Sequence, residues 1–164
     1  MKTIKAVLVT SQNFAPYGTI ADISSPANAY GIGESPCIFY RDMLVAPMES
    51  TAPVAFGSLK VEHRPFVIED VEYHSHAMEG MMPLDDDVIL YAGPANCGTP
   101  ELDRLEAFLV PAGTMVFFRA GAWHGAPYPV HHNATVLICL PERTYLNDTC
   151  KTILKEDEQL TIEL

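Results

Sequence analysis

Three side chains that can hold a metal ion or move a proton lie within six residues of one another, in the stretch VEYHSHAMEG (71–80). His74 and His76 are two residues apart, and Glu79 follows them. Imidazole and carboxylate groups bind divalent transition metals and also act as general acids and bases. A solvent-facing strand that carries two histidines explains the stretch equally well. Taken alone, these residues leave a metal site, a proton relay and a wet strand open.

The elements around this stretch decide where its side chains point. Side chains alternate along a strand, so a strand over residues 71–78 would place Glu72, His74 and His76 on one face. Imidazoles two residues apart on such a strand stand about 7 Å apart. They could converge on one ion if that face lies inside the protein.

Short apolar segments between frequent prolines and glycines, 13 and 10 in number, predict an all-β protein. The expected strands are residues 4–9, 37–45, 54–62, 71–78, 87–93, 106–111, 114–118, 134–140 and 160–164. Short helical turns are expected in 11–18, where Ser11 would be the cap, and in 141–148. The segments 83–88 and 110–118 are expected to form hairpins.

A second segment, GTMVFFRAGAWH (113–124), resembles the second cupin motif: glycine, five residues, proline, any residue, glycine, two residues, histidine. Arg119 stands in place of the proline, and His124 is the histidine. Residues 72–79 resemble the first motif, with a shortened interval before Glu79. In one register Glu72 and His74 match its two histidines, and in the other His74 and His76 do. The resemblance implies a cupin-type double-stranded β-helix, or jelly-roll barrel, as a single cupin-like domain over residues 1–164 with one or two short helical turns.

Nearly the whole chain resembles the ureidoglycolate lyase family, also called ureidoglycolate hydrolase. The matching stretches are FAPYG (14–18), RPFVIEDVEYH (64–74), MMP (81–83), AFLV (107–110) and WH (123–124). The sequence departs from the family in having Glu79 where glutamine is usual, Gly125 where a histidine follows Trp-His, and the acidic turn LDDD (84–87).

This resemblance implies an enzyme that cleaves ureidoglycolate to glyoxylate and urea, a C–N lyase of the amidine-lyase type in allantoin degradation and purine catabolism. The cupin motifs imply a divalent transition metal (Zn, Ni, Mn or Fe) held by His74, His76, Glu79 and His124. The expected catalytic residues are Glu72, His124 and Arg119, with Arg119, Arg41 or Lys60 holding the substrate carboxylate.

Two alternatives remain open at this point. One is another metal-dependent cupin, such as a sugar isomerase or epimerase or an enzyme of another small acid. The other is a non-catalytic cupin that binds a small molecule. Cupins commonly pair through edge strands, so a homodimer through the first or last strand is expected.

Net charge and composition limit the classes of partner that the protein is expected to bind. The net charge of −11 disfavours nucleic acid and anionic membranes and favours a small-molecule substrate. The short apolar run 6–9 and the lack of a membrane-length apolar stretch predict a soluble, cytoplasmic protein. The four cysteines, Cys37, Cys97, Cys139 and Cys150, form no CxxC pair and are expected to be structural thiols. Two of them, Cys37 and Cys139, lie in the apolar runs CIFY and LICL and are expected to be buried.

Overall fold

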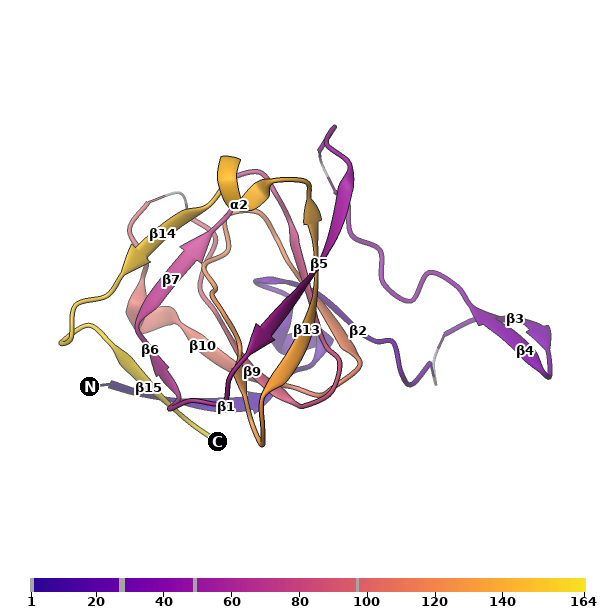
Figure 1. Ribbon diagram of the computed structural model, residues 1–164, viewed down its shortest axis with the longest axis horizontal. Coiled ribbons are helices and arrows are strands. Elements are labelled where there is room, and N and C mark those ends of the chain that lie inside the picture. The colour runs from indigo at the N-terminus through magenta and orange to yellow at the C-terminus, as the bar shows by residue number, and fades with distance from the viewer. Residues whose placement is uncertain (1, 27–28, 49, 97) are drawn as a thin grey trace.

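Two curled β-sheets face each other and enclose the hydrophobic core in a computed structural model (Figure 1). The structure describes residues 2–26, 29–48, 50–96 and 98–164. One sheet has six strands in the order β12-β9-β10-β1-β15-β6, and the other has five in the order β2-β11-β8-β13-β5. This arrangement confirms the predicted all-β barrel. Cys97, which was expected to be a structural thiol, lies outside the described residues.

The strands are grouped here by sheet, each with its first and last residue. The six-stranded sheet contains β1 (Lys2–Leu8), β6 (Val67–Ile68), β9 (Val88–Ala92), β10 (Glu106–Val110), β12 (Tyr128–Pro129) and β15 (Leu160–Glu163). The five-stranded sheet contains β2 (Gly18–Asp22), β5 (Val54–Val61), β8 (Glu79–Pro83), β11 (Thr114–Phe118) and β13 (Ala134–Pro141). Two further pairs are β7 (Asp70–Tyr73) with β14 (Cys150–Ile153) and β3 (Gly31–Glu34) with β4 (Cys37–Tyr40). The helices are α1 (Ser11–Phe14), η1 (Leu102–Arg104) and α2 (Thr144–Asn147).

The core between the sheets is built from the inward-facing side chains of both. Phe14 of α1 is fully buried, and its ring meets those of Phe108 and Phe118 edge-on, with centroids 5.4 and 5.3 Å apart. Helix α1 is thus fixed against the barrel by one aromatic residue. Its N-cap is Thr10, whose hydroxyl accepts a hydrogen bond from the Asn13 backbone N–H. The prediction of Ser11 as the cap was wrong by one residue.

The first and last strands lie inside the six-stranded sheet. Strand β1 pairs in parallel with β10 on one side and with β15 on the other. Figure 1 shows both ends of the chain at the lower left of the barrel, beside β1 and β15. The expectation that the terminal strands form exposed edges was therefore wrong, because each of them is already paired.

The two expected hairpins are crossings between the sheets. Residues 83–88 join β8 to β9, and residues 110–118 contain the turn that joins β10 to β11, and in both cases the joined strands belong to different sheets. The two turns meet where the Gly113 N–H donates to the Pro83 carbonyl at 2.8 Å. Gly113 has a φ of 84°, a left-handed conformation that glycine adopts without strain. The turns were predicted correctly, but the strand pairing across them was not.

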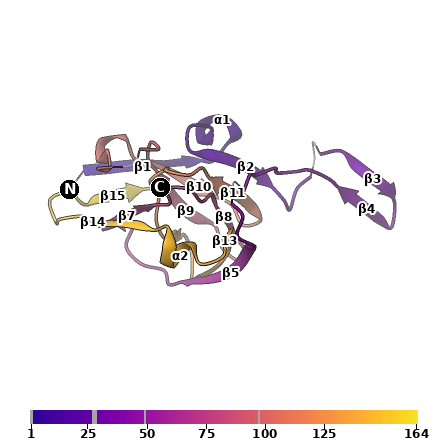
Figure 2. The ribbon, with the colours of Figure 1, turned by 90° about the horizontal axis from the view of Figure 1, so that it is seen from above.

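Between β2 and β5 the chain leaves the barrel. Strands β3 and β4 form a separate two-stranded hairpin that projects from it (Figures 1 and 2). The expected strand 37–45 ends at Tyr40, and Cys37 on it is exposed, whereas Cys139 on β13 is buried. The prediction of a buried thiol was therefore wrong for Cys37.

Among the described residues, no helix is long and apolar enough to cross a membrane.

Candidate metal and catalytic site

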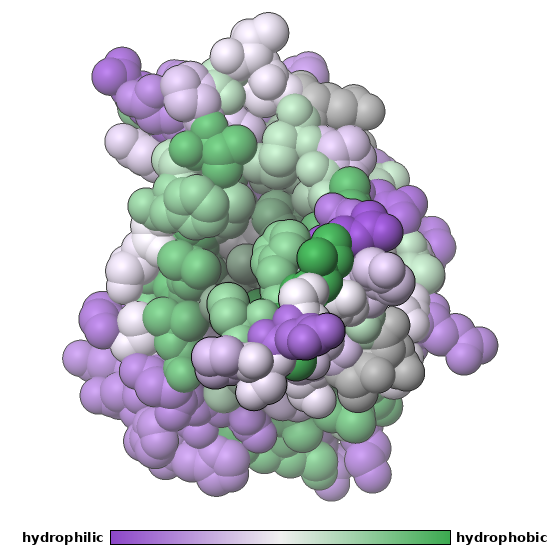
Figure 3. Space-filling model, turned by 90° about the vertical axis from the view of Figure 1, so that its right-hand side faces the viewer, coloured by the Kyte–Doolittle hydropathy of each residue, from purple (hydrophilic) through white to green (hydrophobic). Residues whose placement is uncertain are grey.

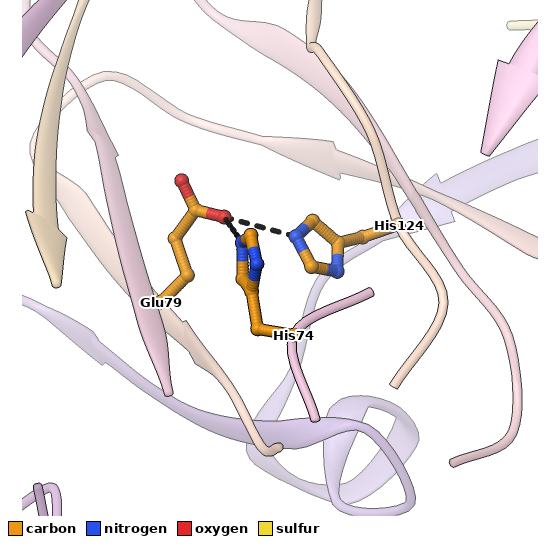
Figure 4. A group of neighbouring side chains, drawn as sticks. All are labelled: His74, Glu79 and His124. Carbon is orange, nitrogen blue, oxygen red and sulfur yellow. Dashed lines mark hydrogen bonds and ion pairs between the residues drawn. The ribbon is translucent and has the colours of Figure 1, made fainter. Parts of the chain in front are cut away.

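Three buried side chains from distant segments meet inside the barrel (Figure 4). His74 follows strand β7, Glu79 opens β8, and His124 lies beyond the end of β11. Backbone hydrogen bonds join the segments: the Glu72 and His124 backbones exchange two bonds, of 2.7 and 2.8 Å, and the Gly121 N–H donates to the His74 carbonyl at 2.7 Å. The barrel thus fixes the positions of the side chains through main-chain pairing.

One carboxylate oxygen of Glu79 faces both imidazoles. Its Oε2 lies 2.9 Å from Nε2 of His74 and 2.9 Å from Nε2 of His124. The donor atoms of the three residues all lie within 4.8 Å of one another. No other group of three His, Cys, Asp or Glu side chains in the described part of the chain meets this criterion.

The outer nitrogens of both rings are committed to backbone carbonyls. Nδ1 of His74 donates to the Asp148 carbonyl and Nδ1 of His124 to the Ala122 carbonyl, each at 2.8 Å. A carbonyl can only accept, so both Nδ1 atoms carry hydrogen and both Nε2 atoms present a lone pair unless they are protonated as well. Two lone pairs that face a carboxylate oxygen at 2.9 Å require a proton or a cation in each contact.

Glu79 and His74 each shift the pKa of the other toward its charged form. Burial raises the pKa of the Glu79 carboxyl, but the hydrogen bonds and charges of His124 and His74 outweigh this effect and lower it to about 2. Burial lowers the pKa of His74, but the hydrogen bond and charge of Glu79 and the Asp148 carbonyl raise it above its ordinary value. Without a metal, Glu79 is an ionised carboxylate, and its charge favours the protonated form of His74.

Asp148 shapes the turn that carries His74. Its carboxylate accepts backbone hydrogen bonds from Ser75, His76 and Ala77 at 2.8 to 2.9 Å, in place of strand pairing. Strand β7 therefore ends at Tyr73, and the alternation expected over residues 71–78 stops there. The same residue thus holds the His74 ring through its carbonyl and the following turn through its side chain.

His76 lies apart from the three buried residues. Its side chain is 90% exposed, and its Nδ1 is 3.7 Å from the Asp148 carboxylate. The expectation that His76 faces the same way as His74 was wrong, because the turn breaks the alternation of the strand. The structure brings together His74, Glu79 and His124, and does not bring His76 to them.

The ring of His124 is fixed on its other face by Phe118. The two rings stack with centroids 4.6 Å apart and an angle of 15° between their planes. Together with the Nδ1 hydrogen bond, this stacking leaves Nε2 of His124 directed at Glu79.

A cavity of about 450 Å³ reaches the carboxylates. It is lined by Glu72 and Glu79, by residues 55–59 of β5, by Arg143 at the N-cap of α2 and by Tyr145 within α2. Among the described residues that line it, Arg143 is the single cation. A larger cavity of about 630 Å³ lies beside β2 and holds neither Glu79 nor its histidines, so the smaller one is the candidate site.

The other expected cations lie elsewhere. Arg119 is exposed and donates to the Ala15 carbonyl, Lys60 donates to the Thr135 hydroxyl, and Arg41 pairs with Asp42. None of the three lines the cavity that contains Glu79.

Arg143 and Asp148 were missed by the sequence analysis. Both belong to the segment 141–148, which was expected to contain a helical turn, and α2 confirms that turn. Arg143 has a φ of 65°, a conformation that costs energy in a residue other than glycine and tends to occur at functional sites. The sequence carries no signal for this backbone conformation.

A curled all-β barrel with a carboxylate and two histidines inside defines a cupin-type protein. Two solved structures of similar fold are the dTDP-6-deoxy-D-glucose-3,5-epimerase of Legionella pneumophila and the dTDP-4-dehydrorhamnose 3,5-epimerase of Elizabethkingia anophelis. The match to the first covers 79% of this chain and 72% of the epimerase chain at 13% identity. The match to the second covers 96% of this chain and 80% of that epimerase chain at 9% identity, and the TM-score is 0.50 for each. At these identities the likeness concerns the fold alone.

The sequence model of the ureidoglycolate lyase family matches residues 1–163, and the chain belongs to that family. It is 29% identical over 127 residues to a putative ureidoglycolate lyase of Agrobacterium fabrum, covering 76% of this chain and 74% of that protein. It is 27% identical over 125 residues to a ureidoglycolate lyase of Rhodobacter capsulatus, covering 74% and 76%. The family expected from the short motifs is thereby confirmed.

The three buried residues fit a divalent transition metal. Their donor set consists of two imidazole nitrogens and one carboxylate oxygen, which suits Zn, Ni, Mn or Fe without selecting among them. The Nδ1 hydrogen bonds to backbone carbonyls are the outer contacts that metal-bound histidines typically make. A metal ion would take the place of the protons that the two Nε2 contacts otherwise need.

We expect the stability of the metal-free protein to depend on pH through this group. A carboxyl with a depressed pKa stabilises the fold above its unfolded pKa, here 4.5, and loses that contribution as the pH falls toward 2. A histidine with a raised pKa contributes fully below about 6.5 and loses that contribution as the pH rises through its folded pKa. Between about pH 4.5 and 6.5 both contributions are present.

The test compares wild type with Glu79→Gln by urea unfolding in chelator at pH 3, 5.5 and 8. The difference in unfolding free energy should be largest at pH 5.5, at roughly 3 kcal/mol for a carboxyl pKa lowered from 4.5 to about 2. Glu163→Gln, at an exposed position, is the control and should show little difference at any pH. A Glu79→Gln effect that is equal at all three pH values would contradict the coupling.

Proposed function

We propose that this protein is a lyase that cleaves ureidoglycolate to glyoxylate and urea in the cavity beside Glu79. The observation that carries the proposal is an ionised carboxylate held by two buried imidazoles at a cavity that also contains a second carboxylate and one arginine. Membership of the ureidoglycolate lyase family supports the substrate. The cavity volume, about 450 Å³, is sufficient for a molecule of this size.

Arg143 is the proposed partner of the substrate carboxylate. The chain has a net charge of −11, and two of the groups that line the cavity are glutamates, so an anionic substrate needs a local cation. A guanidinium can bind a carboxylate through two parallel hydrogen bonds. Arg143 is suited to this role because its side chain is 65% exposed and its contact with Glu142, at 3.1 Å, uses Nε and not the two terminal nitrogens.

Glu72 is the proposed proton acceptor. Cleavage removes the proton of the substrate hydroxyl, forms the carbonyl of glyoxylate, breaks the C–N bond and delivers a proton to the urea nitrogen. A carboxylate with a pKa of about 2 accepts protons poorly near neutral pH, which argues against Glu79. Glu72 is the other carboxylate in the cavity, and its backbone pairs with that of His124, which places the two side chains on the same face. It can take the hydroxyl proton and return it to the leaving nitrogen.

His74, Glu79 and His124 are the proposed ligands of a divalent metal. His76 and Arg119 are omitted from the proposal, since the His76 side chain is 90% exposed and Arg119 donates to the Ala15 carbonyl. The metal, when bound, supplies Lewis-acid stabilisation of the negative charge that develops on substrate oxygen. Apolar side chains also line the cavity, among them Met81, Ile138 and Leu140, and in this proposal they limit the access of water to the substrate.

We expect Glu72→Gln and His124→Ala to lower the rate of glyoxylate and urea release by about 100-fold or more, since the first removes the proton acceptor and the second a ligand of the site. Arg119→Ala is the control and should stay close to wild type, because Arg119 contacts the Ala15 carbonyl and not the cavity. Both products are measured, and circular dichroism verifies folding. Full activity of Glu72→Gln would refute the role of Glu72, and a folded, metal-loaded wild type that leaves ureidoglycolate intact would refute the substrate.

Arg143→Gln should raise the KM for ureidoglycolate by about 10- to 100-fold, which corresponds to the loss of one charged hydrogen-bonding group. The matched control is Arg104→Gln, a similarly exposed arginine that pairs with Glu101 and does not line the cavity. Initial rates over a range of substrate concentrations give KM and kcat for each variant. Equal KM values for the two variants would exclude Arg143 from carboxylate binding.

Metal binding should depend on His74 and not on His76. We expect purified wild type and His76→Ala to contain a similar amount of transition metal by elemental analysis, and His74→Ala to contain much less. Zn²⁺ added to chelator-treated protein should release protons, and its affinity should increase as the pH rises. The reason is that the pKa of His74 is raised and the metal competes with the proton on that ring. Loss of metal in His76→Ala, or its retention in His74→Ala, would contradict the ligand assignment.

A further inference from the structure

The cavity beside Glu79 has a long apolar wall in addition to its charged groups. Glu72, Glu79 and Arg143 carry the charges among the described residues that line it. The apolar wall is built from three neighbouring strands of the five-stranded sheet and consists of Met81 on β8, Ile138 and Leu140 on β13, and Ala55, Gly57 and Leu59 on β5. Strand β5 lies toward the right of the barrel in Figure 1, and the view from that side shows apolar side chains gathered around a hollow (Figure 3).

The strand register places the apolar wall in rows that lead away from Glu79. Met81 pairs with Ile138, and Ile138 pairs with Gly57, so these three residues form one row on one face of the sheet. Glu79 lies two residues before Met81 and faces the same side of its strand. Leu59 lies two residues beyond Gly57, in the direction away from Glu79. From Ala55 to Leu59 the wall extends roughly 13 Å along the strand.

The apolar wall belongs to the protein interior. Met81 is buried, and Leu59 and Ile138 pack against the core between the sheets. Gly57, in the middle row, carries no side chain, and a Cβ placed there would lie 3.9 Å from its nearest neighbour, the Cβ of Ile138. The absence of a side chain at position 57 therefore leaves space in front of the wall.

Ureidoglycolate uses only part of this space. Cavities of about 300 to 1,000 Å³ hold drug-sized ligands. This cavity measures about 450 Å³, and ureidoglycolate is a much smaller molecule. Its terminal amino group carries two hydrogen-bond donors, which need acceptors where water is excluded. The side chains of Leu59, Met81 and Ile138 contain no oxygen or nitrogen, so the wall suits an apolar group better than a ureido group.

We propose that this cavity binds α-hydroxyglycines whose nitrogen carries an apolar acyl group, and that the protein cleaves them to glyoxylate and a primary amide. The inference rests on the proposed function, because it keeps the same reacting atoms and changes only the group beyond the nitrogen. Ureidoglycolate is the member of this class in which a carbamoyl group takes the place of the acyl group. With the substrate carboxylate on Arg143 and the hydroxyl at Glu72, the acyl chain is the part that lies along the apolar wall.

The reaction needs no further reactant. Glu72 takes the proton of the hydroxyl, the carbonyl of glyoxylate forms, and the C–N bond breaks with its electron pair on nitrogen. The proton then passes from Glu72 to that nitrogen, which leaves as the amide R–CO–NH₂. All atoms of the substrate are found in the two products, and no oxidant or reductant takes part.

The first test varies the length of the acyl chain. The kcat/KM of the purified wild type is measured for ureidoglycolate and for racemic N-acetyl-, N-butanoyl- and N-hexanoyl-α-hydroxyglycine, with release of glyoxylate as the common readout and the uncatalysed rate subtracted. A buried methylene is worth about fourfold in affinity. We therefore expect kcat/KM to rise by at least about 10-fold from the acetyl to the hexanoyl compound.

The outcomes separate this inference from the proposed function. Cleavage of ureidoglycolate with no gain along the acyl series would overturn the inference and leave the proposed function standing. Cleavage of the acyl compounds alone would support the inference and refute ureidoglycolate as the substrate. No release of glyoxylate from any of the four compounds would overturn both.

A second test locates the acyl chain. Gly57→Leu fills the space in front of the wall and should lower kcat/KM for the hexanoyl compound at least about 10-fold more than for ureidoglycolate. Gly57→Ala adds only a Cβ in ordinary contact, so it should fold and reduce the gain from chain length by a smaller amount. The matched control is Gly98→Leu, at a glycine outside the cavity lining where a Cβ would have no neighbour within 4 Å, and it should keep the gain. Circular dichroism verifies folding, and a folded Gly57→Leu that keeps the full gain would overturn the assignment of the acyl chain to this wall.

Discussion

The site depends on one oxygen atom of Glu79 that faces two imidazole nitrogens in the protein interior. A buried carboxylate is costly unless it is paired and hydrogen-bonded. Here the two histidines supply both, and burial makes their attraction stronger than it would be in water. In return, the carboxylate raises the pKa of His74. Each of the three side chains is therefore acceptable in the core because of the other two, and together they offer three donor atoms to one metal ion.

The rest of the barrel serves to keep these three atoms in place. The Glu72 and His124 backbones bind each other, Gly121 binds the His74 carbonyl, and Phe118 covers one face of the His124 ring. Asp148 closes the arrangement from the C-terminal part of the chain, because its carbonyl fixes the His74 ring and its carboxylate the turn that follows. Apart from Glu72, these groups do not line the cavity, yet each of them restricts where the nitrogen atoms can point.

The sequence was sufficient to predict the barrel and the three central residues, since strand composition and the spacing of two cupin motifs are local properties. It was not sufficient for His76, whose direction depends on the carboxylate of Asp148, 72 residues away. Arg143 was missed for a related reason, since a left-handed φ in a residue other than glycine is set by its surroundings. The pairing of β1 with β15 joins the two ends of the chain, and no local pattern indicates that the terminal strands lie inside a sheet.

The roles that we propose for the two carboxylates differ because their surroundings differ. Glu79 is stabilised as an anion so strongly that it is a poor base, and this same property makes it a suitable ligand for a cation. Glu72 acts on His74 through its charge, which helps to raise the pKa of that ring, whereas the Nε2 atoms of both imidazoles face Glu79. The proposed division of metal binding from proton transfer follows from this difference, because only Glu79 lies within hydrogen-bonding distance of both imidazoles. Arg143, which lines the same cavity, is the cation that we propose for binding an anionic substrate beside these two carboxylates.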